Sequence, residues 1–543
     1  MNNALTEVAI YDTTLRDGTQ REGISLACSD KLRIAEQLDA LGVAFIEGGW
    51  PGSNPKDAEL FRRARDIEWR HATLTAFGST RRAGISPADD ANLAALLACE
   101  AGACTIFGKT SLRHVREVLR TTPDENLAMI EDSVRYLVAH GRRVIYDAEH
   151  FFDGAGEDAR YAHETLLAAV RGGASTVVLC DTNGGTLPWD VEERVRAVVA
   201  LVDVAVGIHA HDDSGCAVAS SLAAVRAGAA HVQGTLNGYG ERCGNANLTT
   251  IIPDLELKLG IRCLRPGALA ELGRVARNAA EAANLAFDEH APYIGRSAFA
   301  HKGGVHVAAI RRSPRSYEHV DPALVGNRTR FVVSELSGRG NVQALAEAHD
   351  VPLPVDIETG VLDAVKEREA RGFAFESAEA SVALMLRRAS ATYTAPFELV
   401  DFKVLIGKRD GLEAYADAAV KVRVRGEVVH TAAEGNGPVS ALDAALRKAL
   451  LAAYPEVERI HLEDYKVRIV DGREGTSAIT RVLIEHGLAH GNGRGRWTTV
   501  GASPNILEAS LVALVDGIEH GIWLARGTRQ EERDEGHDRL AAG

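Results

Sequence analysis

The chain has 543 residues, which at about 100–200 residues per domain predicts about three domains. With 46% hydrophobic and 25% charged residues, the composition is that of a globular protein and excludes wholesale disorder, collagen-like and coiled-coil architectures. Asp and Glu outnumber Lys and Arg by 75 to 61, and the resulting net charge of −14 argues against nucleic acid as a partner.

The N-terminal half alternates short apolar runs with longer segments of helical periodicity. The apolar runs, which predict strands, are 8–11, 44–47, 74–77, 104–107, 144–147, 176–180, 205–209 and 231–235. Strands that alternate with helices indicate a parallel sheet, and eight such units in about 250 residues predict a (β/α)8 TIM barrel over 1–265. An open doubly wound sheet is the alternative, but the turn at 13–18 lacks the pattern G-x-G-x-x-G.

The rest of the chain predicts two further regions and a tail. Residues 266–395 are mostly helical in pattern, so we expect helical linker subdomains there. A βββα pattern then occurs twice, with strands at 397–406, 416–424, 428–432, 461–470, 478–485 and 497–500, and helices at 440–453 and 506–518. We expect this duplicated module to form a separate domain over 396–525, followed by a disordered tail over 526–543.

Polar and charged side chains follow most of the predicted barrel strands. The active sites of TIM barrels lie at the C-terminal ends of their strands, so side chains at these positions are candidates for binding and catalysis. In chain order they are Arg16, Asp17, Gln20, Glu47, Tyr146, Asp147, Glu149, Asp181, Thr182, Asn183, His209, His211, Asp212, Asp213, Asn237, Glu241, Arg242 and Asn245. A purely structural role would not concentrate so many polar groups at one end of the barrel.

His209 and His211 are the sharpest local signal. In a strand, residues two apart point to the same face, so the two imidazoles lie side by side. With Asp17, which closes the first strand, they would form a metal site with open positions; a hydrogen-bonded histidine pair is the alternative. Arg16 would stabilise a developing oxyanion or form a structural ion pair, and Thr182 would bind a substrate carboxylate or serve in a turn.

Three motifs occur together in this chain: Leu15-Arg16-Asp17-Gly18-x-Gln20, His209-x-His211, and Gly240-Glu241-Arg242-x-Gly244-Asn245. Together they resemble the 2-isopropylmalate/homocitrate/citramalate synthase family, and the resemblance extends over nearly the whole chain. These barrel enzymes add acetyl-CoA to a 2-oxo acid in a Claisen-type condensation. Segment 47–56 is most similar to the citramalate synthases, whose 2-oxo acid is pyruvate.

The resemblance implies a role for each matching residue. Asp17, His209 and His211 would bind a divalent metal, with Asn245 beside it, and the set does not distinguish Mn, Mg, Zn or Co. Arg16 would polarise the 2-oxo group. The residues implied to line the oxo-acid pocket are Gln20, Tyr146 and Thr182. The residues implied to support the acetyl group and to help remove its methyl proton, the last two across a homodimer, are Glu149, His306 and Tyr317.

The resemblance also implies regulation. In this family the duplicated C-terminal module binds an amino-acid end product, and because citramalate leads to isoleucine we expect isoleucine as the effector, with leucine as the second candidate. Other 2-oxo acids, 2-oxoisovalerate or 2-oxoglutarate, remain alternatives to pyruvate. A metal-dependent aldolase or lyase, and a binding protein with an inert barrel, are the alternatives from other classes.

The chain carries no sign of secretion or of a membrane span. It has seven cysteines, an odd number, and no Cys-x-x-Cys pair, which argues against a disulfide framework and fits a reducing compartment. The N-terminus lacks a basic region followed by an apolar core, and no apolar run approaches the ~18 residues of a membrane span. We therefore expect a cytoplasmic enzyme.

Overall fold

The computed structural model describes residues 5–541 except 335–336, 349–350, 352–354, 391–392, 409, 411–412, 471 and 489–494. These residues form two compact units: 1–299 with 320–328, and 300–319 with 329–543. No helix among the described residues combines the length and the apolar character that a membrane crossing requires.

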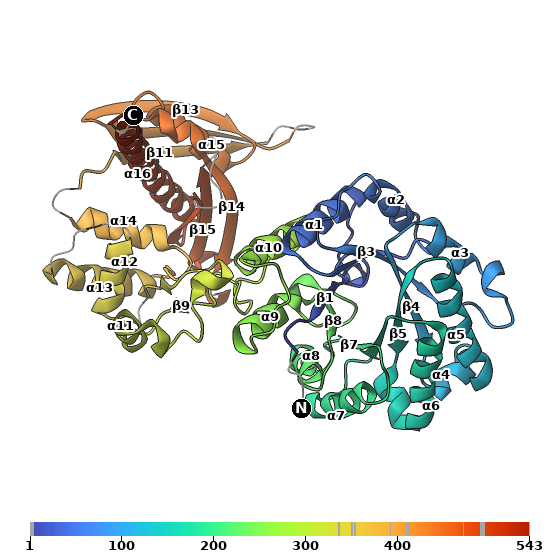
Figure 1. The fold of residues 1–543 in the computed structure, drawn as a ribbon. Coiled ribbons are helices and arrows are strands. Elements are labelled where there is room, and N and C mark those ends of the chain that lie inside the picture. Colours follow the sequence, from blue (N-terminus) through green and yellow to red (C-terminus); the bar gives the residue numbers. More distant parts are fainter. Residues whose placement is uncertain are drawn as a thin grey trace. The chain divides into compact units, whose positions relative to one another are not determined.

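The first unit contains a closed barrel of eight parallel strands, which confirms the predicted TIM barrel (Figure 1). The strands follow one another around the barrel, and β1 closes it by pairing with β8. They are β1 (Ala9–Asp12), β2 (Phe45–Gly49), β3 (Thr73–Ser79), β4 (Ala103–Lys109), β5 (Arg143–Glu149), β6 (Thr176–Asp181), β7 (Ala205–Ala210) and β8 (His231–Gly234). Their C-terminal ends all meet at one mouth of the barrel.

Helices cover the outside of the barrel (Figure 1). They are α1 (Cys28–Leu41), α2 (Pro55–Ala64), α3 (Ala91–Ala98), α4 (Leu112–Glu117), α5 (Pro123–Ala139), α6 (Phe151–Gly172), α7 (Pro188–Val199) and α8 (Ala217–Arg226), followed by α9 (Leu248–Pro253) and α10 (Leu272–Ala282). Helix starts follow local chemistry: Asn54 accepts a hydrogen bond from the Lys56 backbone, and Pro55 occupies the first turn of α2.

Side chains alternate between two cores along the strands. Outward-facing residues pack with the helices, whereas Tyr11, Phe45, Ile145, Val178 and Cys180 form a small separate core inside the barrel. The polar residues at the inward positions nearer the mouth are therefore the ones that a substrate could meet. This alternation decides which predicted site residues can reach the site.

The second unit begins with short helices and two-residue strands. Strands β9 (Ala300–His301) and β10 (Arg330–Phe331) pair in parallel. The helices are α11 (Gly304–Arg312), α12 (Arg339–Ala348), α13 (Val355–Ala370) and α14 (Glu379–Ala389), with a hydrophobic core of their own. This mostly helical region agrees with the helical pattern of the sequence there.

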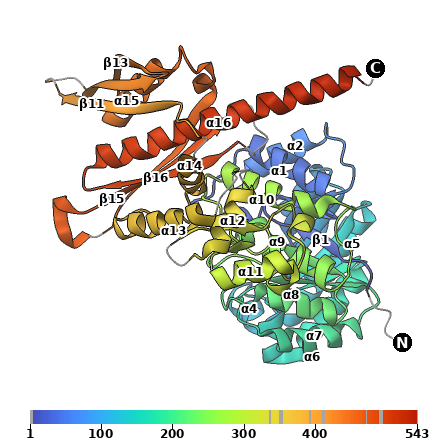
Figure 2. The same cartoon turned by 90° about the vertical axis from the view of Figure 1, so that its left-hand side faces the viewer.

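Two βββα modules complete this unit and confirm the predicted duplication (Figure 2). Each consists of a three-stranded antiparallel sheet and a helix. The first is β11 (Phe397–Gly407), β12 (Tyr415–Val424), β13 (Glu427–Gly435) and α15 (Pro438–Leu450); the second is β14 (Ile460–Ile469), β15 (Thr480–Leu488), β16 (Trp497–Ser503) and α16 (Ile506–Ala541). Helix α16 continues through most of 526–543, for which the sequence predicts a disordered tail.

Candidate active site

Three side chains at the barrel mouth converge on one point. His209 lies at the end of β7, His211 follows it, and Asp17 follows β1. Nε2 of His209 is 3.3 Å from Oδ2 of Asp17 and 3.3 Å from Nε2 of His211, and one ligand atom from each residue lies within 4.8 Å of the others. All three residues are buried. Two imidazoles and a carboxylate are a donor set for a divalent metal, as the sequence predicts.

Asn245 completes this cluster. Its Nδ2 donates to Oδ2 of Asp17 at 2.9 Å, while its buried Oδ1 and the buried Nδ1 of His211 have no hydrogen-bond partner among the described residues. Buried polar atoms usually have a partner, so unpaired ones beside the possible metal ligands indicate that a further group would bind there. Gly240 has a φ of +157°, and a Cβ there would lie 2.3 Å from Oδ1 of Asn245, so this motif position requires glycine.

The pKa values of Asp17 and His211 suit metal ligation. Burial alone would raise the pKa of Asp17, but the Arg16 guanidinium and the hydrogen bond with His209 hold that pKa well below its usual range. Burial, reinforced by His209, lowers the pKa of His211 to about 4. At neutral pH, therefore, Asp17 is ionised and His211 is neutral, which are the forms that bind metals.

Arg16 is fixed beside the cluster by Glu47. Its Nε donates to Oε2 of Glu47 at 2.6 Å, its Nη1 lies 3.6 Å from Oδ2 of Asp17, and its guanidinium lies 3.7 Å from the centre of the Phe77 ring. Glu47 is fully buried and also accepts hydrogen bonds from the hydroxyls of Tyr11 and Thr13. The structural ion pair considered for Arg16 therefore exists, and it orients the guanidinium at the mouth.

A second hydrogen-bonded chain orients His209. Nδ1 of His209 is 2.9 Å from Oε1 of Gln233, and Nε2 of Gln233 donates to Oδ1 of Asp147 at 2.9 Å. Because Gln233 uses its amide N–H on Asp147, its oxygen faces His209 and must accept from Nδ1–H. With Nδ1 donating to Gln233, Nε2 is the nitrogen of His209 that faces Asp17, and it would bind a metal after losing the proton it shares with that carboxylate. Burial raises the pKa of Asp147 to about 7.

Replacing Gln233 with leucine should weaken metal binding by roughly 10- to 100-fold, because partners of this kind orient and polarise histidine ligands. Gln233→Glu keeps an acceptor for the Nδ1–H of His209 and should lose much less. The affinity is measured by titrating the full chain with Mn²⁺ and following free Mn²⁺ by electron paramagnetic resonance. Equal affinities of the wild type and the leucine variant would contradict this role.

Three further predicted residues lie in the loops and strand ends at the mouth. Gln20 is exposed in the short turn after β1. Glu149, at the end of β5, is ion-paired with Lys109 at the end of β4. Oγ1 of Thr182 accepts from the His150 backbone at 2.9 Å, so its hydroxyl hydrogen is left for another acceptor.

The loop after β8 is held to the loops of its neighbours by Arg242. Its Nη2 donates to the Thr182 carbonyl at 2.7 Å, and its Nε donates to Asp213 at 2.7 Å. The next residue, Cys243, is exposed, and all seven cysteines are free thiols.

Tyr146 is the predicted pocket residue that the structure places elsewhere. It belongs to the core outside the barrel, whereas its neighbour Ile145 belongs to the core inside. Its hydroxyl lies across Gly108, beside Ile130 of α5. The expectation for Tyr146 is therefore corrected, because the alternation of β5 points Asp147, and not Tyr146, into the barrel.

An aromatic group that the sequence reasoning did not include lies near Arg16. The rings of Trp50, Phe77 and Phe107 have centroids 5.5–5.7 Å apart, and Phe77 stacks on Phe107. Arg16 lies over Phe77, so this apolar wall borders the charged cluster. Glu47 is among the strand-end candidates of the sequence, whereas Gln233 and this wall could have been found by asking which residues near the strand ends face inward.

His306 and Tyr317 belong to the second unit. His306 lies in α11, and its ring stacks on that of Tyr317 with centroids 4.3 Å apart. Tyr317 is 47% exposed. These two predicted residues are therefore in contact. Their role at the site of a partner subunit stays a prediction.

Three family models match successive segments of the chain. A model of HMGL-like domains matches residues 7–272, one of homocitrate synthase post-HMGL domain-like regions matches 293–372, and one of the LeuA allosteric (dimerisation) domain matches 376–522. An (R)-citramalate synthase of Geobacter sulfurreducens is 50% identical over 94% of this chain and 97% of its own length. Another, of Synechocystis sp., is 52% identical over 96% and 97%.

The chain belongs to the (R)-citramalate synthase family. A probable 2-isopropylmalate synthase of Methanopyrus kandleri is more distant, at 32% identity over 96% of this chain and 99% of its own length. The family resemblance of the three motifs is thus confirmed, and the matches to citramalate synthases agree with the similarity in segment 47–56. Membership of this family also accounts for the barrel and the duplicated module in one chain.

Proposed function

We propose that this chain condenses acetyl-CoA with pyruvate to form (R)-citramalate and CoA, as the names of its relatives indicate. The observation that carries the proposal is the buried set of Asp17, His209 and His211 beside a fixed Arg16 at the mouth of a TIM barrel. The three ligands would hold a divalent metal. Such an ion, when bound, supplies a Lewis acid that polarises the keto group of a 2-oxo acid.

Side chains of the protein would stabilise the developing negative charge and transfer the protons. Arg16 would donate to the oxygen of pyruvate that becomes an oxyanion as the new carbon–carbon bond forms, and Glu47 fixes it in advance for this task. Thr182 would donate its hydroxyl hydrogen to the substrate carboxylate. A base removes a methyl proton of acetyl-CoA, and we assign this step to Glu149 together with His306 and Tyr317 of the partner subunit. Water then cleaves the thioester and releases CoA.

The aromatic wall beside Arg16 favours an oxo acid with an apolar side chain. Trp50, Phe77 and Phe107 form an apolar wall beside Arg16, which suits the methyl group of pyruvate. The second carboxylate of 2-oxoglutarate would need an uncommitted cation, and Lys109 is already ion-paired with Glu149. The wall therefore supports an oxo acid with an apolar side chain over the dicarboxylic alternative, and the similarity to citramalate synthases favours pyruvate over the branched one.

The test is a panel of oxo acids with the full chain. Pyruvate should give the highest kcat/KM, with 2-oxobutyrate lower by roughly tenfold and 2-oxoisovalerate by roughly a hundredfold, because each misfitting methyl group changes binding by about 1–3 kcal/mol. The products are quantified by mass spectrometry, and metal-stripped protein is the control. A higher kcat/KM with 2-oxoisovalerate or 2-oxoglutarate would overturn the assignment to pyruvate.

We further propose a cytoplasmic homodimer inhibited by isoleucine. The match to the LeuA allosteric (dimerisation) domain supports the dimer and the regulation. Each three-stranded sheet also leaves large aliphatic side chains exposed, Leu405 and Ile406 on one and Val467 and Ile469 on the other. Initial rates measured against isoleucine and leucine decide the effector, and light scattering gives the oligomeric state.

A further inference from the structure

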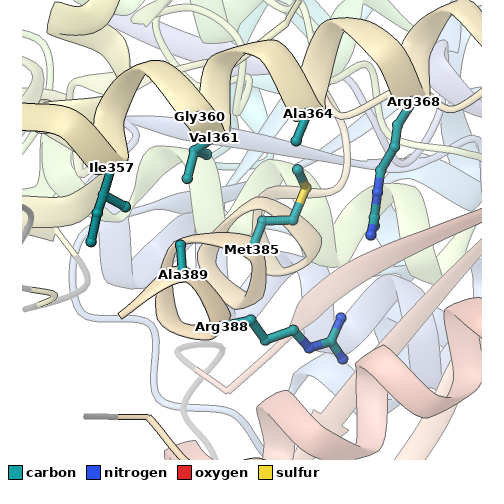
Figure 3. A pocket seen from close by; sticks show the side chains of 8 residues that line it. All are labelled: Ile357, Gly360, Val361, Ala364, Arg368, Met385, Arg388 and Ala389. Carbon is teal, nitrogen blue, oxygen red and sulfur yellow. The ribbon is translucent and has the colours of Figure 1, made fainter. Parts of the chain in front are cut away.

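A pocket of about 340 Å³ lies between α13 and α14 in the second unit (Figure 3). Its lining follows helical spacing, so one face of each helix forms one wall. The lining residues are Ile357, Gly360, Val361, Ala364 and Arg368 of α13, and Met385, Arg388 and Ala389 of α14. The volume is in the range of small-molecule sites. None of these residues belongs to the barrel.

The wall is apolar along most of its length and cationic at one end. The two arginine side chains lie at the same end of the pocket, and the aliphatic side chains occupy the rest (Figure 3). A ligand that matches both parts has an aliphatic body and one anionic group. A carboxylate is the simplest such group, because it accepts two parallel hydrogen bonds from a guanidinium.

The two arginines of the pocket differ in their partners. Arg388 of α14 binds α16: its Nη2 donates to Asp516 at 2.7 Å and to Glu519 at 2.6 Å. Arg368 lies near the ring of Phe373, at 5.8 Å, and among the described residues it has no carboxylate within ion-pair distance. Arg368 is therefore the guanidinium that a ligand can use.

The carboxylates next to the pocket are paired with Arg388. The carboxylates of Asp516 and Glu519 are satisfied by Arg388, and Glu519 also accepts from the hydroxyl of Tyr393. Arg387, the residue before Arg388, is buried over the ring of Trp523. Of the two charged side chains in the lining, Arg388 is thus neutralised by α16, and Arg368 is the one whose guanidinium is left for a ligand.

We propose that this pocket binds a small aliphatic monocarboxylate, with its hydrocarbon part between α13 and α14 and its carboxylate on Arg368. The site joins the segment that matches the homocitrate synthase post-HMGL domain-like model to the one that matches the LeuA domain. Because Arg388 lines the pocket and also holds α16, the ligand would contact a residue that ties the linker helices to the second βββα module.

The chain offers a site-specific probe for this test. It contains only three methionines, Met1, Met129 and Met385, and Met385 lines the pocket while Met129 lies in α5 of the barrel. The full chain labelled with ¹³C at the methionine methyls is titrated with 4-methylpentanoate in the presence of saturating pyruvate, and Met385→Leu assigns the signal. The Met385 signal should shift saturably, and the Met129 signal should stay unchanged.

Two comparisons show whether the carboxylate is recognised. The uncharged 4-methylpentanamide, and 4-methylpentanoate with the Arg368→Gln variant, should each bind about tenfold more weakly, which corresponds to about 1.4 kcal/mol. Lys366→Gln, an exposed cation on the same helix, is the matched control and should leave the affinity unchanged. An unmoved Met385 signal, equal affinity for the amide, or full affinity in Arg368→Gln would overturn the proposal.

Discussion

Replacing Asp17 with asparagine should lower kcat/KM for citramalate formation by roughly a thousandfold, together with a large loss of metal affinity. The change keeps the size of the side chain and removes the one carboxylate of the cluster, so His209 and His211 would remain as two neutral donors. Activity is measured by mass spectrometry, and metal content is measured by elemental analysis after dialysis.

The control for this change is Asp203→Asn. Asp203 is an exposed carboxylate on the same unit, away from the cluster. It should leave both the activity and the metal content unchanged. An Asp17→Asn protein that retains its metal and its turnover would show that the cluster is a hydrogen-bonded group and not the metal site.

Replacing Arg16 with lysine should lower kcat by roughly a hundredfold with an intact fold. Lysine keeps the positive charge beside Glu47 and Asp17, but it has no planar fork and cannot present a fixed donor to an oxyanion while it binds Glu47. Arg16→Gln goes further, because it leaves Glu47 buried without its cation, which costs about 3–5 kcal/mol of unfolding free energy.

A double variant separates these two effects. Arg16→Gln with Glu47→Gln removes the buried charge together with its partner, so the unfolding free energy should return towards that of the wild type. Activity should stay low, because the donor to the oxyanion is still missing. Recovery of turnover in the double variant would mean that Arg16 acts only as the counter-ion of Glu47. Urea unfolding curves and kcat provide the two readouts.

The barrel and the duplicated module could be predicted from the sequence because both depend on local patterns repeated along the chain. The eight apolar runs each became a strand, and both βββα series formed sheets. The metal cluster could also be predicted, since His209-x-His211 is a local motif and Asp17 follows the first strand. In each case, the spacing of residues within one short segment was sufficient for the prediction.

The parts that escaped prediction depend on which face of a strand a residue occupies. Tyr146 and Asp147 are neighbours within β5, and a shift of one residue in phase exchanges the inward position between them. Gln233 becomes a site residue only through its partner on another strand, His209, and the role of the candidate Glu47 depends on its contact with Arg16 in the turn after β1. Such contacts between distant segments leave no pattern within a single segment.

The position of Cys243 affects how turnover can be measured. An aromatic disulfide reagent, the usual detector of released CoA, reacts with any accessible thiolate, and Cys243 is the exposed thiol of the chain. The reaction would attach a bulky group directly after Arg242, which ties the loop after β8 to Thr182 and Asp213. A continuous assay would then record a decline in rate caused by its own reagent. Cys243→Ser protein, in which this decline should disappear, makes that format usable.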